Sequence, residues 1–486
     1  MTAAGGDEVA LVPWPVLFRR KVEHRIARSE RQRWWVLWTV LAGLFAVNVN
    51  FTVFAITLPR LADEFDSTVN TMTWAITGPL LAFGVAAPVL GRTGDVRGHK
   101  RVYLVGMVGA LAAAALTAVA WSTGTLIFAR VLGGVEGAAT GAASMAMIFK
   151  AFPPDDRVKA MGYWSLVGAG GPVLGVVIGG FVIEHIGWRW IFAAQVPLIL
   201  AALAMAVVVL PDTERVQRGR LDWPGALTLT AASGSVLFAL NRGTEWGWTD
   251  PTVVIAFALA PISAVAFVAA ERRAVEPLLP LDYLRRRNFT FAIGAQAFSN
   301  FAYLGGFVLA PLLLSKVYGY DEGRISQLVI ARPITFSITA PIAGYLAVRW
   351  GERQAAVVGT LAVVASMLLF AGLDADSGDG LIVVALALSG VGLGVSSPSV
   401  AASVGNAVAD DDLGIASAAS QIMTQVGIVA GIQLMVTVQA SRAGAAGLVG
   451  SFSDAYLVGA GVGLLGVLCA LFVRSAERAP APAPIR

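Results

Sequence analysis

Charged residues, cysteine and histidine are all scarce in this chain of 486 residues. Charged side chains make up 14%, against about 25% in soluble globular domains, so a soluble protein is excluded. The single cysteine, Cys469, allows no intramolecular disulfide and no cysteine-rich metal site. The dipeptide Gly-Lys does not occur, which excludes the phosphate-binding loop G-x-x-x-x-G-K-S/T and an ATPase built on it. The three histidines, His24, His99 and His185, fall in polar connections, so neither a metal nor a cofactor is expected.

Long apolar runs take the place of charge. Apolar residues make up 57% of the chain, and the mean hydropathy is +0.72. Each run is close to the roughly 20 residues that a helix needs to cross about 30 Å of hydrocarbon. Lipid cannot satisfy open backbone groups, so each run is predicted to be a helix. Fourteen spans are predicted, at 35–58, 72–91, 102–121, 125–148, 161–184, 188–211, 224–241, 251–270, 289–314, 325–349, 355–373, 381–403, 415–438 and 453–473.

Lysine and arginine are unevenly distributed between the connections. One side receives 27 of the 35 basic residues and the other six, while Arg130 and Arg332 lie inside spans. Positive charge marks the cytoplasmic side, so both termini of a cell (inner) membrane protein are predicted to be cytoplasmic. The net charge of +4 then reflects topology and anionic lipid, not nucleic acid. Residues 11–33 are typical of a helix lying on the inner leaflet, with a disordered basic tail as the alternative.

The connection between spans two and three, residues 91–101, carries the first motif. It combines a turn glycine, Gly98, and one carboxylate, Asp95, with several cations. The segment resembles the signature loop of the major facilitator superfamily, G-x-L-A-D-R-x-G-R-R/K. A similar segment at 344–353 has Val348 in place of the acid, as a duplicated transporter would leave. The positions that depart from the first pattern are Thr93, Val96 and His99.

The resemblance implies that this loop is a conformational latch, in which Asp95 docks onto span thirteen. The three acids Asp410–Asp412 precede that span, and a helix N-terminus favours negative charge. Their expected partners are Arg97, Lys100 and Arg101. A generic positively charged cytoplasmic loop is the alternative. The predicted latch residues are Gly91, Asp95, Gly98, Lys100 and Arg101.

The fifth span contains a stripe of glycines. Gly171, Gly175 and Gly179 are spaced four residues apart, so they share one face that lets another helix approach closely. Pro172 removes the hydrogen bond to the carbonyl of Gly168, which predicts a bend. The run resembles the antiporter motif of drug-exporting members of the superfamily, whose core is G-P-x-x-G-G. Helix packing without transport is the alternative.

Further segments resemble the fourteen-span drug:proton antiporter branch of that superfamily. Residues 188–197 resemble its motif W-R-W-I-F-x-x-N-x-P, and residues 222–248 resemble its two extra helices. The branch usually has an aspartate, tied there to proton coupling, where this chain has Asn50. The implied fold is an all-α polytopic membrane protein with two six-helix halves and two inserted helices. Its expected parts are a cytoplasmic segment 1–34, the halves 35–211 and 289–474, the inserted helices with their linkers 212–288, and a disordered tail 475–486.

Three charged side chains lie well inside predicted spans: Arg130, Glu136 and Arg332. Inserting a charged side chain into the membrane at the centre of a helix costs about 2.5–3.5 kcal/mol, so all three are expected to face protein or water. Arg130 fits the arginine of the superfamily's fourth-span motif, R-x-x-Q-G-x-G. Because Asn50 carries no charge, Glu136 is the expected proton carrier. The alternative is a structural acid, paired with Arg130 or permanently protonated.

Few polar side chains are available to line a substrate cavity. Gln296, Asn300 and Tyr303 share one face of span nine, because they are spaced i, i+4 and i+7. An apolar pocket with a few hydrogen-bonding groups suits lipophilic ligands. Ordinary hydrogen bonds between helices are the alternative use of such side chains. The other cavity candidates are Asn50, Gln421 and Gln425.

Together these features predict a secondary active exporter of lipophilic compounds or drugs, not an enzyme. The resemblance implies proton-coupled antiport by alternating access, with the small lipophilic substrate, protons and membrane lipids as partners of a monomer. A lipid or glycolipid exporter of the same fold, with or without coupling, is the first alternative. A non-transporting membrane sensor or scaffold is the second, disfavoured because the chain has no soluble output domain.

Overall fold

The described part of the chain is built from helices. The computed structural model describes residues 31–48, 61–211, 222–275 and 277–474, and no strand occurs in them. The helices of the first half and the two inserted helices are α2 (Gln32–Asn48), α4 (Val69–Arg97), α5 (His99–Ala118), α6 (Thr123–Ala151), α7 (Pro154–His185), α8 (Arg189–Val209), α9 (Trp223–Trp246) and α10 (Pro251–Glu271). Those that follow are η1 (Leu281–Arg285), α11 (Arg287–Lys316), α12 (Glu322–Val329), α13 (Ala331–Trp350), α14 (Glu352–Ala371), α15 (Asp379–Asn406), η2 (Asp410–Asp412) and α16 (Leu413–Phe472).

The predicted all-helical membrane architecture is confirmed, with helix at each of the fourteen predicted positions. Eleven helices among the described residues are long and apolar enough to cross a membrane. The pair α12 and α13 supplies span ten, and α16 supplies the last two spans. The 60 residues of α16 are interrupted at Gly447, whose φ of 72° no helix accepts. The chain around the predicted connection 439–452 is therefore helical up to that glycine.

Several helices begin earlier and end later than the apolar runs because polar residues cap them beyond the hydrocarbon. The hydroxyl of Ser122 accepts a hydrogen bond from the amide of Thr125 at the start of α6 (3.2 Å), and Thr68 does the same for Thr71 in α4 (3.1 Å). Pro154 opens α7, the position where a missing amide hydrogen costs nothing. Helices α4 and α6, with 29 residues each, and α7, with 32, thus exceed the roughly 20 residues that hydrocarbon requires.

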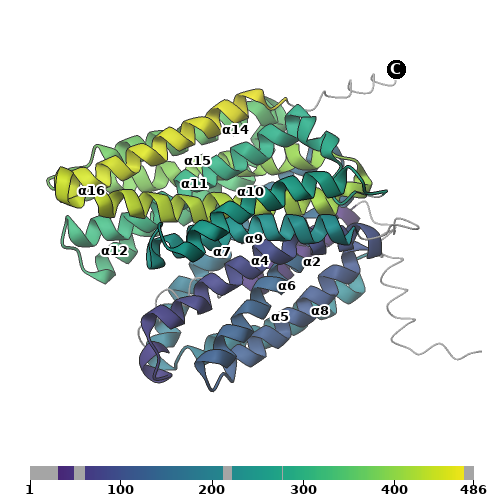
Figure 1. The fold of residues 1–486 in the computed structure, drawn as a ribbon, viewed down its shortest axis with the longest axis horizontal. Helices are drawn as coiled ribbons and strands as arrows, with labels where there is room; N and C mark the ends of the chain where they lie inside the picture. The colour runs from purple at the N-terminus through teal and green to yellow at the C-terminus, as the bar shows by residue number, and fades with distance from the viewer. Residues whose placement is uncertain (1–30, 49–60, 212–221, 276, 475–486) are drawn as a thin grey trace, which may run out of the picture.

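The inserted helices bridge the two helical bundles. In Figure 1, α2, α4, α5, α6 and α8 form one bundle, and α11, α12, α14, α15 and α16 form the other, with α9 and α10 across the front. Helix α9 packs on α4 and on α16, and Ser233 donates a hydrogen bond to the carbonyl of Gly84 (3.1 Å). Leu237 of α9 is buried with Val429 of α16. The predicted boundaries of the halves stay a prediction, since residues 212–221 lie outside the described part.

Helix α7 also joins the bundles, because it packs against α2 of one and against α13 and α15 of the other. A side chain at Gly162 would lie 2.7 Å from the carbonyl oxygen of Ala340, and one at Gly344 would lie 2.9 Å from that of Val158. Both glycines therefore allow the two backbones to approach closely. Gly344 belongs to the segment that repeats the first motif, so this segment holds the halves together.

Candidate functional site

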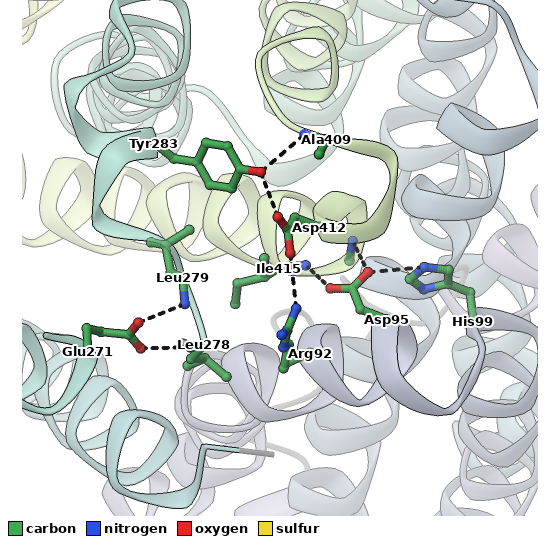
Figure 2. A network of polar contacts seen from close by, with 11 residues as sticks. Arg92, Asp95, His99, Glu271, Leu278, Leu279, Tyr283, Ala409, Asp412 and Ile415 are labelled. Carbon is green, nitrogen blue, oxygen red and sulfur yellow. Dashed lines mark hydrogen bonds and ion pairs between the residues drawn. The ribbon is translucent and has the colours of Figure 1, made fainter. Parts of the chain in front are cut away.

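A polar network joins the two halves where α4 ends and α16 begins (Figure 2). Gly98 ends α4 with a φ of 97° and starts α5 at the next residue. Only glycine adopts this conformation without strain, so the tight turn predicted at Gly98 is present. The turn sets the direction of the last turn of α4, which carries Asp95.

Asp95 docks on the N-terminus of α16, as the resemblance implied. Its two oxygens accept hydrogen bonds from the amides of Gly414 (2.8 Å) and Ile415 (3.0 Å). The first amides of a helix have no partner within the helix and carry a partial positive charge. The Asp95 residue is only 1% exposed, so water does not weaken these bonds.

His99 lies on the other side of the same carboxylate. Its Nε2 atom is 3.3 Å from Oδ1 of Asp95, and both side chains are buried. A side chain at Gly94 would lie 2.5 Å from Nδ1 of His99, so the glycine makes room for the imidazole. Histidine thus occupies the place of the family's arginine and contacts Asp95 directly.

Gly91 and Gly414 bring the two helices into backbone contact beside Asp95. We predict that Gly414→Ala slows export several-fold, because the added carbon would lie 2.4 Å from the Gly91 carbonyl oxygen and 2.6 Å from Asp95 Oδ1. Overpacking of this kind costs about 1–3 kcal/mol, here only in the state where α4 and α16 touch. The measurement is the initial export rate in membrane vesicles. Gly444→Ala is the control, since a carbon added there meets open space. Equal rates in the two variants would contradict the prediction.

Arg92 and Tyr283 extend the contact to the segment after the inserted helices. Arg92 forms an ion pair with Asp412 (3.1 Å). The hydroxyl of Tyr283 donates to the other oxygen of Asp412 (2.6 Å) and accepts from the amide of Ala409 (3.2 Å). Burial raises the pKa of Tyr283, and its hydrogen bond to Asp412 raises the pKa further. We call Arg92, Asp95, Asp412, Tyr283 and the first amides of α16 the clamp.

The predicted ion-pair partners of the acidic cluster were wrong. Asp412 pairs with Arg92, and Asp410 pairs with Arg157 of α7 (3.2 Å). Lys100 follows the Gly98 turn on α5, where it is buried and donates to the carbonyl of Leu210 at the end of α8. Arg97 and Arg101 are exposed. The turn points the basic run away from α16, and the arginine one turn before Asp95 takes its place.

A second polar cluster joins α7 to the other half. Arg157 donates to the carbonyl of Gly405 (3.0 Å) and to the side chain of Asn406 (3.1 Å). Glu352 accepts hydrogen bonds from Asn406 (3.0 Å) and Ser403 (2.8 Å). The repeated motif therefore has an acid after all, four residues beyond Val348. Sequence spacing alone gave no signal for this shift.

Glu136 lies inside the first half rather than between the halves. It is 7% exposed, and its Cβ would be 3.1 Å from a carbon added at Gly109 of α5. Thr140, one turn later, donates weakly to its Oε2 (3.5 Å). Arg130 of the same helix donates to the carbonyl of Ala75 in α4 (3.2 Å). Both predicted buried charges of this half thus face protein.

Arg332 lies in the core of the second half with no exposed surface. Its Nε donates to Ser389 of α15, and Nη1 donates to the carbonyl of Tyr303 in α11 (3.1 Å). The guanidinium carbon is 4.8 Å from the centre of the Tyr303 ring and 5.6 Å from that of Phe307. This arginine also faces protein, as its cost in lipid requires.

Two of the predicted cavity residues make ordinary helix contacts. Gln296 donates to Thr424 of α16 (3.1 Å), and Asn300 donates to the carbonyl of Gln296 (2.8 Å). Gln421 reaches the other half, where its Nε2 would lie 2.9 Å from a carbon added at Gly141 of α6. Gln425 is half-buried. Asn50 lies outside the described residues.

The antiporter-type glycine run lies within α7. The helix continues through it from Pro154 to His185, and Gly168 is exposed. The packing of Gly171, Pro172, Gly175 and Gly179 lies outside what the structure describes. The expected bend and the close approach of a partner helix therefore stay predictions.

Similar proteins share both the sequence and the fold of this chain. A family model described as the Major Facilitator Superfamily matches residues 40–432 and 292–486. The tetracenomycin C resistance and export protein of Streptomyces glaucescens is 30% identical over 429 residues, which are 87% of this chain and 79% of that protein. The puromycin resistance protein pur8 of Streptomyces alboniger is 31% identical over 413 residues, 84% and 82% of the two chains.

Two solved structures show the same fold at low sequence identity. The human organic anion transporter MFSD10 superposes with a TM-score of 0.66 at 17% identity, covering 90% of this chain and 99% of that one. The proton:xylose symporter XylE gives 0.64 at 14% identity, covering 92% and 96%. The chain therefore belongs to the Major Facilitator Superfamily and is a membrane transporter of its multidrug efflux type, not an enzyme.

Proposed function

We propose that this protein is a proton-coupled antiporter that exports lipophilic compounds by alternating access. The observation that carries the coupling is Glu136, the acid that lies deepest within a span in the described part of the chain. The names of its relatives, as resistance and export proteins, support the direction of transport. A carboxyl out of water can carry a proton between two states if each state exposes it to a different side.

The clamp is the element with two states. Docked, Asp95 holds α4 of one half against α16 of the other, and Arg157 holds α7 against α15. These contacts gather at the end of the bundle that bears Arg92, Arg157 and Arg286, which we assign to the cytoplasm by the positive-inside rule. The conformation described is then closed to the cytoplasm. Opening the cytoplasmic end breaks both sets of bonds, and the binding of substrate offsets the free energy lost with them.

Transport in proteoliposomes tests the proposal. A lipophilic dye is added outside vesicles in which the cytoplasmic face of the protein points outward. The dye should accumulate in the lumen when the lumen is made acidic, and its entry should release protons from the lumen. An uncoupled lipid or glycolipid exporter is the second candidate, favoured by Asn50 in place of the branch's aspartate. Its signature would be movement of labelled lipid with no proton flux.

We place both termini in the cytoplasm of the cell (inner) membrane and treat the protein as a monomer in contact with lipid. Apolar side chains such as Val105, Ile255 and Val265 are more than half exposed, as lipid-facing residues would be. We predict that Asp376→Cys reacts with an impermeant maleimide in intact cells, whereas Arg97→Cys reacts only after permeabilisation. Both positions are exposed, whereas Lys100 is too buried to label. The measurement uses a background without Cys469, and labelling of Asp376→Cys only after permeabilisation would contradict the topology.

A further inference from the structure

Arg332 is a buried cation that no acid neutralises among the described residues. Its side chain forms no ion pair there, and its acceptors are a serine hydroxyl and a backbone carbonyl. The third nitrogen, Nη2, is buried and has no hydrogen-bond partner at all. Arginine stays protonated in proteins, so the charge cannot be removed by loss of a proton. A lone buried charge of this kind is costly unless something else compensates it.

The acids of the second half are too far away or already engaged. Asp379 is the first residue of α15, ten residues before Ser389, which is about 15 Å along a helix. It already accepts hydrogen bonds from Arg324 and from Tyr320 (2.6 Å). At the other end of α15, Glu352 is held by Ser403 and Asn406. Neither acid lies beside the guanidinium.

The guanidinium is surrounded by aromatic rings and a methionine rather than by negative charge. Tyr303 and Phe307 of α11 lie against the guanidinium. Gly306, between them in sequence, presents no side chain, and a carbon added there would lie 2.8 Å from Cε of Met367 and 3.4 Å from Nη2. The flexible Met367 side chain therefore fills the volume beside Nη2. Tyr303 shares a helix face with Gln296 and Asn300, and Phe307 is half-buried. Arg332 therefore lies directly behind the aromatic residues of α11, one of which is partly open to its surroundings.

We propose that Arg332 is the binding site for the anionic group of an amphiphilic substrate, a lipophilic carboxylic acid in its ionised form. This rests on the proposed export function and names its substrate class. A carboxylate would accept hydrogen bonds from Nη2 and its neighbouring nitrogen, the geometry that guanidinium groups favour. The apolar body would then lie against Tyr303 and Phe307. In the described conformation the Tyr303 ring and the Met367 side chain cover the guanidinium, so both turn aside as the acid enters.

A matched pair of probes tests the site directly. Pyrenebutyrate and pyrenebutyramide share one aromatic body, but only the first carries a carboxylate. We expect the purified full-length protein in nanodiscs to bind pyrenebutyrate at least about tenfold more tightly, which is the strength of a hydrogen bond to a charged group. Pyrenebutyrate alone should also raise the midpoint of thermal unfolding. Equal affinity for the two probes in the wild-type protein would overturn the proposal without recourse to any variant.

Substitutions then assign the preference to Arg332. Arg332→Gln should bind both probes equally, and Arg332→Met, which suits an apolar core if the glutamine variant does not fold, should do the same. Arg324→Gln is the control, because that side chain is 49% exposed and pairs with Asp379 near the outer ends of α12 and α15. A preference that persists in Arg332→Gln or Arg332→Met, or that is lost in Arg324→Gln, would show that the acid binds elsewhere.

The same probes separate this proposal from the proposed function. Binding requires no gradient, so a tenfold preference without uphill transport would keep the anion site and refute coupled export. Uphill transport of both probes at equal rates would keep the export function and refute the anion site.

Discussion

Replacing Asp95 with asparagine is expected to remove most transport activity while the protein still folds and reaches the membrane. Both oxygens of the carboxylate accept amide hydrogens from α16, whereas an asparagine has one oxygen and an NH₂ group. One amide of the helix would then face another donor in a site that excludes water. Hydrogen bonds to charged groups contribute about 1.5–3 kcal/mol each. The equilibrium constant between the docked and undocked states should therefore fall at least about tenfold.

The measurement is the rate of substrate counterflow in proteoliposomes, normalised to folded protein. Asp411→Asn is the matched control, because it removes a carboxylate from the same helix start but at an exposed position. Asp95→Asn should be slow and Asp411→Asn should match the wild type. A wild-type rate for Asp95→Asn would show that the docking of Asp95 does not limit the rate of the transport cycle.

The sequence was sufficient for the architecture because lipid leaves few choices. A run of about 20 apolar residues can only be a helix in hydrocarbon, and each predicted span contains one. The docking of Asp95 on α16 was also predictable, since the motif and the two-half arrangement together specify it. The early start of α7 was not predictable, because it depends on the residues that cap the helix. The helical segment 439–446 was not predictable either, because it depends on a single glycine, Gly447.

The partners within the clamp and in the second polar cluster were not predictable. Tyr283 and Asp412 are 129 residues apart, and Arg157 and Asp410 are 253 apart, so only the packed fold brings them together. The basic run 97–101 offered three cations for three acids, and the turn at Gly98 directs all three away from α16. The polar face of α11 shows the same limit. Its residues share one side as spacing predicted, but Gln296 bonds to α16.

Neutralising Glu136 is expected to abolish uphill transport while leaving substrate binding intact. Proton coupling requires a group that takes up a proton on one side and releases it on the other, and Asn50 cannot do so. One charge moved through 100 mV is worth about 2.3 kcal/mol, enough for roughly fifty-fold accumulation. In Glu136→Gln this accumulation should fall to the level set by passive equilibration. Downhill exchange should persist, because Glu136 faces α5 rather than the boundary between the halves.

The decisive measurement is proton release evoked by substrate in proteoliposomes, with Asp282→Asn as the control. Asp282 is 85% exposed and contacts Arg285 at 3.8 Å, so its loss removes a carboxylate without touching a buried site. If Glu136→Gln releases as many protons as the wild type, the acid is structural, and its role is to satisfy Thr140 within the first half. If substrate moves downhill in both proteins and neither releases protons, the clamp still alternates but no proton drives it. Uncoupled lipid or glycolipid export would then be the better account, because it needs the two-state clamp and not the buried acid.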